Sequence, residues 1–381
     1  MFCADDFLRN YWQQKPILIK NYFSNFQDPL EAEELAGLAL EESIESRLVL
    51  NTPEHPYQLS HGPFNEETFL ALPESHWTLL VQAVDQVVPE VDALKAAFSF
   101  LPSWRMDDVM VSCATPGGGV GPHFDQYDVF LLQGSGRRRW KIGGKCHKDT
   151  PLKTDSGLKL LTEFEVEQEF ILESGDALYI PPGIAHWGTG EDSGLCYSFG
   201  FRAPSHAELL EAFSDELMDR TGEFDRYRDS QLEPATATGE IDSKVLEDSW
   251  QAINQALQQK QLFPEAFGKL ITQPRYPDQH FSLEPPVQAA QLAALVADGA
   301  MIFRHPGSRF AWRRDDSAAG LTVFIDGETF LQPQQNLQAV ISLCDVSIEY
   351  ITEIAAPTNP EQWHNLVLKL VNRGSLLLLQ S

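Results

Sequence analysis

The 381-residue sequence contains little positive charge, little cysteine and no long apolar run. Its 28 Lys and Arg stand against 55 Asp and Glu, which gives a formal net charge of −27. Such an excess of negative charge argues against a protein that coats nucleic acid or binds an anionic membrane, because phosphate groups would be repelled. No apolar run approaches the roughly 18–20 residues that span a bilayer, so we expect no membrane-spanning segment.

The five cysteines are scattered along the chain and form no Cys-x-x-Cys pair. An odd number of dispersed thiols indicates neither a disulfide framework nor a zinc site, and it fits a reducing compartment. The first residues lack the basic and apolar regions of a secretory signal. We therefore expect a cytoplasmic protein with free thiols.

The overall composition is that of an ordinary globular protein, with 43% hydrophobic and 10% aromatic residues. Over 1–205, short β-rich runs alternate with Gly and Pro, a spacing typical of a β-sandwich or barrel of the jelly-roll type. Helical patterns are interposed around 31–47 and 76–97. We therefore predict a mainly β domain with added helices over 1–205.

The pattern changes to a helical one over 206–271. Ser205 and Glu208 have the spacing of a capping box, which marks the start of a helix. A second apolar stripe recurs at helical spacing through Leu246, Trp250, Ile253 and Leu257. A few amphipathic helices cannot easily close a core alone, so we expect this segment to pack on the barrel or on a second copy of the chain, and we favour a homodimer.

The last part, 272–381, combines a helix over 287–300 with strands and a hairpin at Asp326-Gly327, a pattern that resembles a winged-helix domain. Winged helices often bind DNA. This stretch carries 7 basic and 11 acidic residues, a balance of −4, whereas a DNA reader normally shows a basic footprint. We expect a structural or protein-contact role here.

A candidate metal site begins at His123 and Asp125, which follow a glycine-rich loop and precede an apolar strand. In an extended segment, side chains two residues apart share a face, so both can point at one ion. The same His-x-Asp form occurs at His147 and Asp149, but that pair lies in a polar stretch with no strand after it. We interpret His147 as a surface loop residue.

The third candidate ligand is His186, which follows the run Gly175-Asp-Ala-Leu-Tyr-Ile-Pro-Pro-Gly183. A Gly-Asp turn starts a strand, and the prolines with glycine end it in a tight turn that presents the histidine at a barrel mouth. Two histidines and one carboxylate form a facial triad, which suits Fe(II) and leaves positions open for a bidentate 2-oxo acid and dioxygen. Zinc would usually find more nitrogen or sulfur ligands, while Mn(II) or Ni(II) could occupy the same triad.

A 2-oxo acid with a second carboxylate needs an anchor, and Arg138 is the candidate. Arg138 alternates in phase with Trp140 and Ile142, so it points into the barrel, whereas Arg137 and Arg139 point outward. A buried guanidinium needs an anionic partner, and a carboxylate held by two parallel hydrogen bonds suits it. The alternative is an internal salt bridge.

Ser112 lies on the strand before the glycine-rich loop, and its hydroxyl could also contact the oxo acid. The alternative is a serine in the barrel wall without a role in binding.

These residues resemble the JmjC-type, cupin-fold 2-oxoglutarate oxygenases. Gly175, Pro181, Gly183 and His186 match the cupin signature, although the Asn that often follows four residues later is replaced by Gly190. A basic residue fifteen positions after the first metal histidine looks like the family's oxoglutarate-binding Lys or Arg. The stretch 11–20 is also similar to this family. The resemblance implies that His123, Asp125 and His186 hold Fe(II) and that Arg138 binds 2-oxoglutarate.

The order of barrel, helical dimerisation segment and winged-helix end resembles the ribosomal oxygenases over nearly the whole chain. That resemblance implies an Fe(II)- and 2-oxoglutarate-dependent protein hydroxylase. Bacterial members hydroxylate an arginine of large-subunit ribosomal protein number sixteen, and their human relatives hydroxylate histidines of other ribosomal proteins. A basic ribosomal protein would also fit the acidic charge, which is −15 over 1–205, −8 over 206–271 and −4 over 272–381.

Two other functions compete with this one. A non-oxygenase metal-binding cupin predicts that no succinate forms from oxoglutarate. A regulator with a sensor barrel and a winged helix predicts salt-sensitive binding to duplex DNA.

Overall fold

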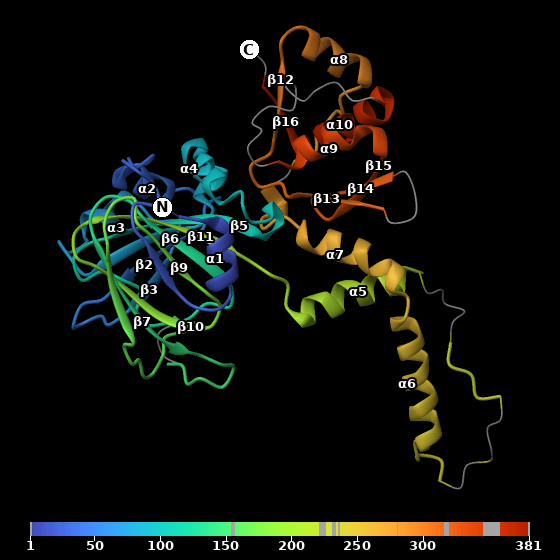
Figure 1. The fold of residues 1–381 in the computed structure, drawn as a ribbon, viewed down its shortest axis with the longest axis horizontal. Helices are drawn as coiled ribbons and strands as arrows, with labels where there is room; N and C mark the ends of the chain where they lie inside the picture. Colours follow the sequence, from blue (N-terminus) through green and yellow to red (C-terminus); the bar gives the residue numbers. More distant parts are fainter. Residues whose placement is uncertain are drawn as a thin grey trace. The chain divides into compact units, whose positions relative to one another are not determined.

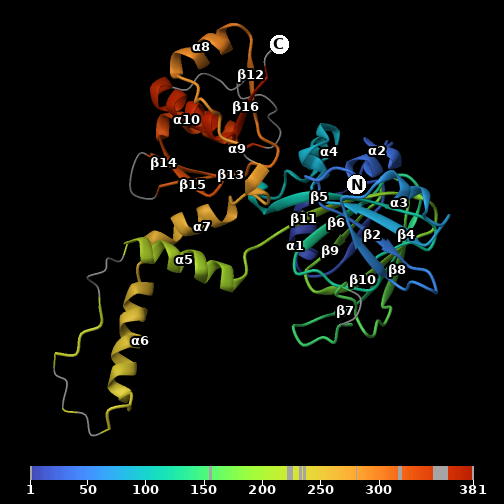
Figure 2. The same ribbon diagram turned by 180° about the vertical axis from the view of Figure 1, so that it is seen from behind.

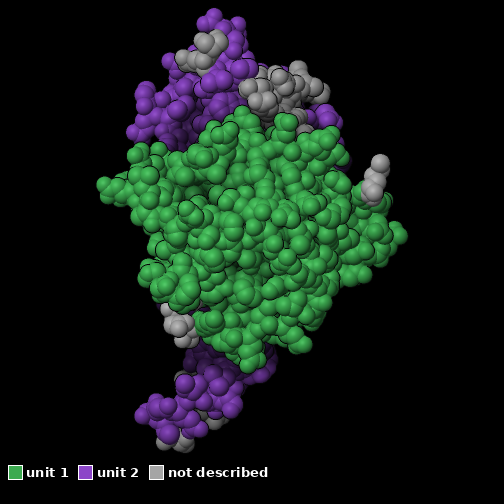
Figure 3. All heavy atoms as spheres, turned by 90° about the vertical axis from the view of Figure 1, so that its left-hand side faces the viewer, with its two compact units in different colours: residues 1–203 green, residues 204–381 purple. Residues whose placement is uncertain are grey.

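A computed structural model describes residues 2–153, 157–220, 226–230, 234, 237–279, 281–315, 320–345 and 359–379. The chain divides into two compact units, 1–203 and 204–381, which Figure 3 colours separately. The division of the second unit into a helical segment over 206–271 and a winged-helix domain over 272–381 stays a prediction. No helix of the described residues is long and apolar enough to cross a membrane.

Unit 1 is built from two antiparallel sheets that curl into a double-stranded β-helix, the jelly-roll core (Figures 1 and 2). The larger sheet has eight strands in the order β1-β9-β6-β11-β5-β4-β2-β3, and the smaller has three in the order β10-β7-β8. The strands are β1 (Ile17–Ile19), β2 (Ser46–Leu50), β3 (Gln58–His61), β4 (Trp77–Val81), β5 (Met106–Ala114), β6 (Asp128–Gln133), β7 (Arg138–Lys145), β8 (Gln168–Leu172), β9 (Ala177–Ile180), β10 (Ile184–Gly190) and β11 (Gly194–Phe201).

The central strands of the large sheet are buried on both faces, which explains their continuous apolar sequences. In β6, Val129 and Leu131 point to the smaller sheet, whereas Phe130 and Leu132 point to the opposite core. The helices α1 (Ala4–Asn10), α2 (Ala32–Leu38) and α4 (Pro89–Ala93) contribute to that opposite core, and α3 (Glu66–Leu70) carries no buried residue. The inner face toward the small sheet is therefore the one that can hold a site.

The predicted helix over 76–97 is wrong for its first part. Trp77–Val81 forms β4, because it pairs with β2 on one side and with β5 on the other. The pattern of apolar residues in so short a run does not distinguish a buried strand from a helix. The pattern over 31–47 likewise holds only the short helix α2 before β2 begins.

Unit 2 contains the predicted helices and the predicted winged-helix hairpin. Its helices are α5 (His206–Arg220), α6 (Ser243–Leu257), α7 (Phe263–Ile271), α8 (Ala289–Ala297), α9 (Leu337–Cys344) and α10 (Pro360–Arg373), and its strands are β12 (Met301–Arg304), β13 (Phe310–Arg314), β14 (Gly320–Ile325), β15 (Glu328–Pro333) and β16 (Leu376–Leu379). Asp326 and Gly327 join β14 to β15 with φ angles of 49° and 78°, as the hairpin signal predicts. Ser205 and Glu208 form both bonds of the capping box that begins α5.

Candidate metal and cosubstrate site

The three predicted metal ligands lie close together in the structure. His123 and His186 are locked to each other by two backbone hydrogen bonds, 3.0 Å from His123 N to His186 O and 2.8 Å in return. Asp125 Oδ2 lies 3.9 Å from His123 Nε2 and 3.5 Å from His186 Nε2. All three ligand atoms lie within 4.8 Å of one another, a spacing that allows one ion to contact them together.

The backbone fixes the orientation of both imidazoles. His123 Nδ1 lies 2.9 Å from Gly121 O, and His186 Nδ1 lies 2.9 Å from Ile184 O. A carbonyl only accepts, so each Nδ1 carries the proton and donates it, which leaves each Nε2 with a lone pair for a metal.

The protonation states also suit a metal. Burial and the neighbouring His186 imidazole lower the pKa of His123 to about 4. Burial alone would raise the pKa of Asp125, but the neighbouring His186 and His123 imidazoles hold it below its ordinary value. At neutral pH His123 is therefore neutral and Asp125 ionised, as metal ligands must be. Two imidazole nitrogens and one carboxylate are the donor set of a facial triad, and they fit Fe(II).

Glycines in the loop before His123 allow the backbone to approach its neighbours closely. A Cβ at Gly119 would lie 2.2 Å from the carbonyl oxygen of Gly188 on β10. Gly121 has a φ of +85°, a left-handed conformation that disfavours other residues. The loop therefore positions His123 next to β10, the strand that carries His186. The Pro-Pro-Gly turn closes the other side, since Gly183 N donates to Asp125 O at 2.7 Å.

Arg138 lies inside the jelly roll on β7, and its side chain pairs with none of the described acidic residues. Its Nη1 donates to Ser112 Oγ at 2.9 Å, and the two residues are 7% and 2% exposed. No carboxylate among the described residues lies within ion-pair distance of Arg138, which removes the internal salt bridge as an explanation there. Arg137 and Arg139 face outward and pair with acids, Arg137 with Asp192 at 2.7 Å.

His147 lies apart from the triad, as its polar surroundings predict. It is exposed in a turn in which its backbone N donates to Thr150 Oγ1 at 2.8 Å. The His-x-Asp form alone therefore does not define the site.

One charged residue near the triad was missed by the sequence reasoning. The guanidinium of Arg47 on β2 acts electrostatically on both His123 and Asp125. Its Nη2 donates to Gln82 Oε1 at 3.2 Å, and Gln82 Nε2 donates in turn to Asp108 Oδ2 at 2.6 Å. Nothing in the local sequence signals this, because β2 joins β5 only through β4.

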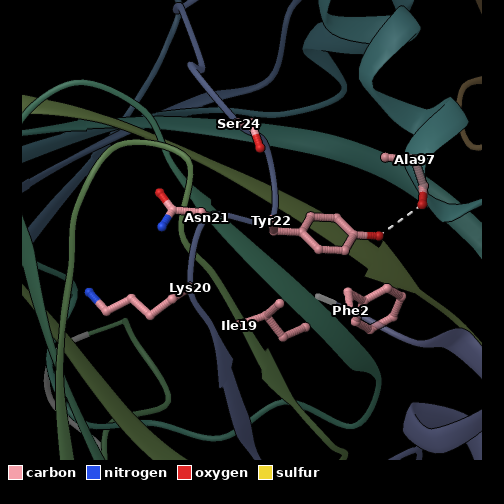
Figure 4. A pocket seen from close by; sticks show the side chains of 7 residues that line it. All are labelled: Phe2, Ile19, Lys20, Asn21, Tyr22, Ser24 and Ala97. Carbon is pink, nitrogen blue, oxygen red and sulfur yellow. Dashed lines mark hydrogen bonds between the residues drawn. The ribbon is translucent and has the colours of Figure 1, made fainter.

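A cavity of about 600 Å³ lies elsewhere in unit 1, beside β1 and the residues that follow it (Figure 4). Two of its polar side chains already have partners, since Lys20 pairs with Asp176 at 2.7 Å and the Tyr22 hydroxyl donates to Ala97 O at 2.8 Å. None of the triad residues lines it.

Comparison with known proteins assigns the chain to a family. A family model described as a JmjC domain matches residues 93–209, and a ROXA-like winged helix matches residues 255–377. The ribosomal protein uL16 3-hydroxylase of Escherichia coli is 38% identical over 330 residues, which cover 87% of this chain and 86% of that protein. The chain belongs to the ribosomal oxygenase family.

Solved structures of a ribosomal oxygenase have the same fold. The structure of YcfD from Escherichia coli superposes with a TM-score of 0.83 at 35% identity, covering 99% of this chain and 98% of that one. Another structure of YcfD, in complex with cobalt and 2-oxoglutarate, has a TM-score of 0.83 at 34% identity with the same coverage. Membership of the ribosomal oxygenase family favours the oxygenase over the two competing functions.

Proposed function

We propose that this chain is an Fe(II)- and 2-oxoglutarate-dependent hydroxylase whose substrate is an arginine of ribosomal protein uL16. The observation that carries the proposal is the combination, in one jelly roll, of the triad with a buried Arg138 that pairs with no described acid. The relative named uL16 3-hydroxylase and the YcfD complex with cobalt and 2-oxoglutarate support it.

His123, Asp125 and His186 would hold Fe(II), which when bound supplies the activation of dioxygen. Arg138 and Ser112 would anchor the far carboxylate of 2-oxoglutarate, because the guanidinium offers parallel donors and the hydroxyl a further one. Overall, one substrate C–H bond, dioxygen and 2-oxoglutarate give the hydroxylated substrate, succinate and carbon dioxide. The residues of the chain position the reactants and exclude side reactions.

The charge of the chain supports a basic protein substrate. A net charge of −27 attracts a cationic partner and repels folded ribosomal RNA. We therefore infer that the enzyme acts in the cytoplasm on the free ribosomal protein before it is assembled.

The test is to incubate the enzyme with iron, 2-oxoglutarate and total ribosomal protein, and to measure by mass spectrometry a gain of one oxygen atom. We expect the gain on an arginine of uL16, at a faster rate for the free protein than for the intact large subunit. A matched reaction with the Asp125→Ala variant should give none. Oxygen on a histidine of another protein would contradict the substrate, and no oxygen on any protein would contradict the hydroxylase.

We also infer that the chain is a homodimer through α6. None of its residues is buried, and its apolar stripe is left exposed, with Leu246 at 59%, Trp250 at 58% and Ile253 at 52%. Apolar surface of this extent usually marks a contact with another protein. The Trp250→Asp variant should halve the mass measured by light scattering, whereas Glu247→Gln on the same helix should not.

A further inference from the structure

We propose that Trp140 is a further cosubstrate-binding residue, whose indole N–H donates a hydrogen bond to the bound 2-oxo dicarboxylate between Arg138 and the metal triad. The inference rests on the proposed function of this site. It concerns a residue for which the sequence pattern indicates only a place in the barrel core.

The indole nitrogen of Trp140 is a buried donor with no partner among the described residues. The residue is 6% exposed, and Nε1 makes no hydrogen bond to any described residue. Buried polar groups are nearly always paired, so an orphaned one requires an explanation. Tryptophan is only a donor, so the missing partner must be an acceptor.

The sheet register places Trp140 between the two ends of the proposed cosubstrate site. On β7, Arg138 pairs with Gly190, Trp140 with Gly188 and Ile142 with His186. Arg138 and Trp140 share the inner face of the strand. The indole also approaches the metal ligand His186, with ring centroids 6.0 Å apart. A dicarboxylate held by Arg138 at one end and by the metal at the other therefore passes Trp140.

The indole is held in place from the side of β10. A Cβ at Gly188 would lie 2.7 Å from the six-membered ring of Trp140, so the ring packs directly on the glycine backbone. This close packing keeps the ring from turning toward a different acceptor. The other orphaned buried atoms of the described residues, Thr78 Oγ1, Gln133 Oε1 and Thr329 Oγ1, lie on neither β7 nor β10.

The chemistry of 2-oxoglutarate matches this donor. The molecule offers carboxylate and keto oxygens, all of which are acceptors. A hydrogen bond from the indole to an ionised carboxylate is charge-assisted and stronger than one to a neutral group. Trp140 would thus join Arg138 and Ser112 as a third donor to the cosubstrate.

The first test compares Trp140→Phe, which keeps an aromatic ring and removes the N–H, with the parent chain. Calorimetry would measure the affinity of Mn(II)-loaded protein for 2-oxoglutarate. We expect the affinity to fall by about tenfold or more, the effect of losing a hydrogen bond to a charged group. The matched control is Trp187→Phe. Trp187 lies next to His186 but contacts Lys141 and Phe164 instead, and we expect no change.

The affinity for Mn(II) and the melting temperature serve as checks that Trp140→Phe is folded. The affinity for Mn(II) should equal that of the parent, and unfolding should stay cooperative at a melting temperature a few degrees lower, because the smaller ring leaves a cavity. Equal affinity of a folded Trp140→Phe and the parent for 2-oxoglutarate would overturn the proposal. If the parent protein itself binds no 2-oxoglutarate, the proposed function is wrong. If the parent and the variant bind it equally well, only the role of Trp140 is wrong.

The second test measures the indole N–H of the parent protein directly and uses the variant only to assign its resonance. In parent protein labelled with ¹⁵N-tryptophan and loaded with Zn(II), the indole N–H resonance missing from Trp140→Phe belongs to Trp140. We expect 2-oxoglutarate to move this resonance downfield, as a new hydrogen bond does, and to leave that of Trp187 in place. A Trp140 resonance that 2-oxoglutarate does not move would overturn the proposal.

Discussion

The sharpest consequence of the site concerns the substitution Arg138→Met, which removes a buried charge and keeps a side chain of similar length. In the protein without cosubstrate, Arg138 is 7% exposed and its guanidinium donates to Ser112 Oγ. Taking such a cation out of water without an acid is costly. We therefore expect Arg138→Met to be more stable than the parent when no 2-oxoglutarate is present.

The magnitude follows from the burial. Replacing buried ionic groups with apolar ones of similar volume stabilises proteins by about 1–4 kcal/mol. For a unit of 203 residues, each kcal/mol raises the melting temperature by about 2–4 °C, so a gain of about 2 kcal/mol corresponds to about 4–8 °C. In the bound state, an unpaired carboxylate costs about 3–5 kcal/mol, which corresponds to a loss of about 150-fold to several thousandfold in affinity.

The assay is thermal unfolding of Mn(II)-loaded protein with and without 2-oxoglutarate. Saturation at about 100 times the dissociation constant stabilises the parent by about 2.7 kcal/mol and leaves Arg138→Met unchanged, so the difference in stability should narrow or reverse. The matched control is Arg139→Met, since Arg139 lies on the outer face beside Glu169 and Glu191. An Arg138→Met variant that is less stable than the parent and binds 2-oxoglutarate equally well would refute the reasoning.

Three further predictions follow from particular contacts. His123→Ala should abolish the formation of succinate from 2-oxoglutarate, whereas His147→Ala, in the same His-x-Asp form, should keep the parental rate. Burial alone would raise the pKa of Glu216, but the Lys269 ammonium 2.7 Å away holds it below its ordinary value. This stabilisation is full above about pH 4.5 and is lost as the pH falls through the lowered pKa, so Glu216→Gln should lower the melting temperature at pH 7 and progressively less as the pH falls below 4.5. Gly188→Ala should lower the melting temperature of the cosubstrate-free protein by several degrees, because the added methyl meets the indole at 2.7 Å; an unchanged melting temperature would contradict that contact.

Local patterns in the sequence determined the elements of the site that depend on neighbouring residues. Because side chains alternate across a strand, the sequence predicted that His123 and Asp125 share a face and that Arg138 points inward. The glycine and proline residues of the turns around β9 pointed to His186. The polar residues around His147 separated that histidine from the triad. The resemblance to the ribosomal oxygenases, carried by the same residues, agrees with the family that the comparisons show.

The tertiary structure decided what depends on residues far apart in the chain. The backbone bonds between His123 and His186 join positions 63 residues apart, and the carbonyls of Gly121 and Ile184 fix which nitrogen of each imidazole is left for a metal. The pairing of β4 on both sides overrode a helical pattern, since hydrogen bonds to neighbouring strands outweigh local preference. The sequence predicted that Arg138 is buried, but only the fold showed that no described acid pairs with it and that no described residue accepts from the indole N–H of Trp140, because hydrogen-bond partners are a property of the whole packed interior.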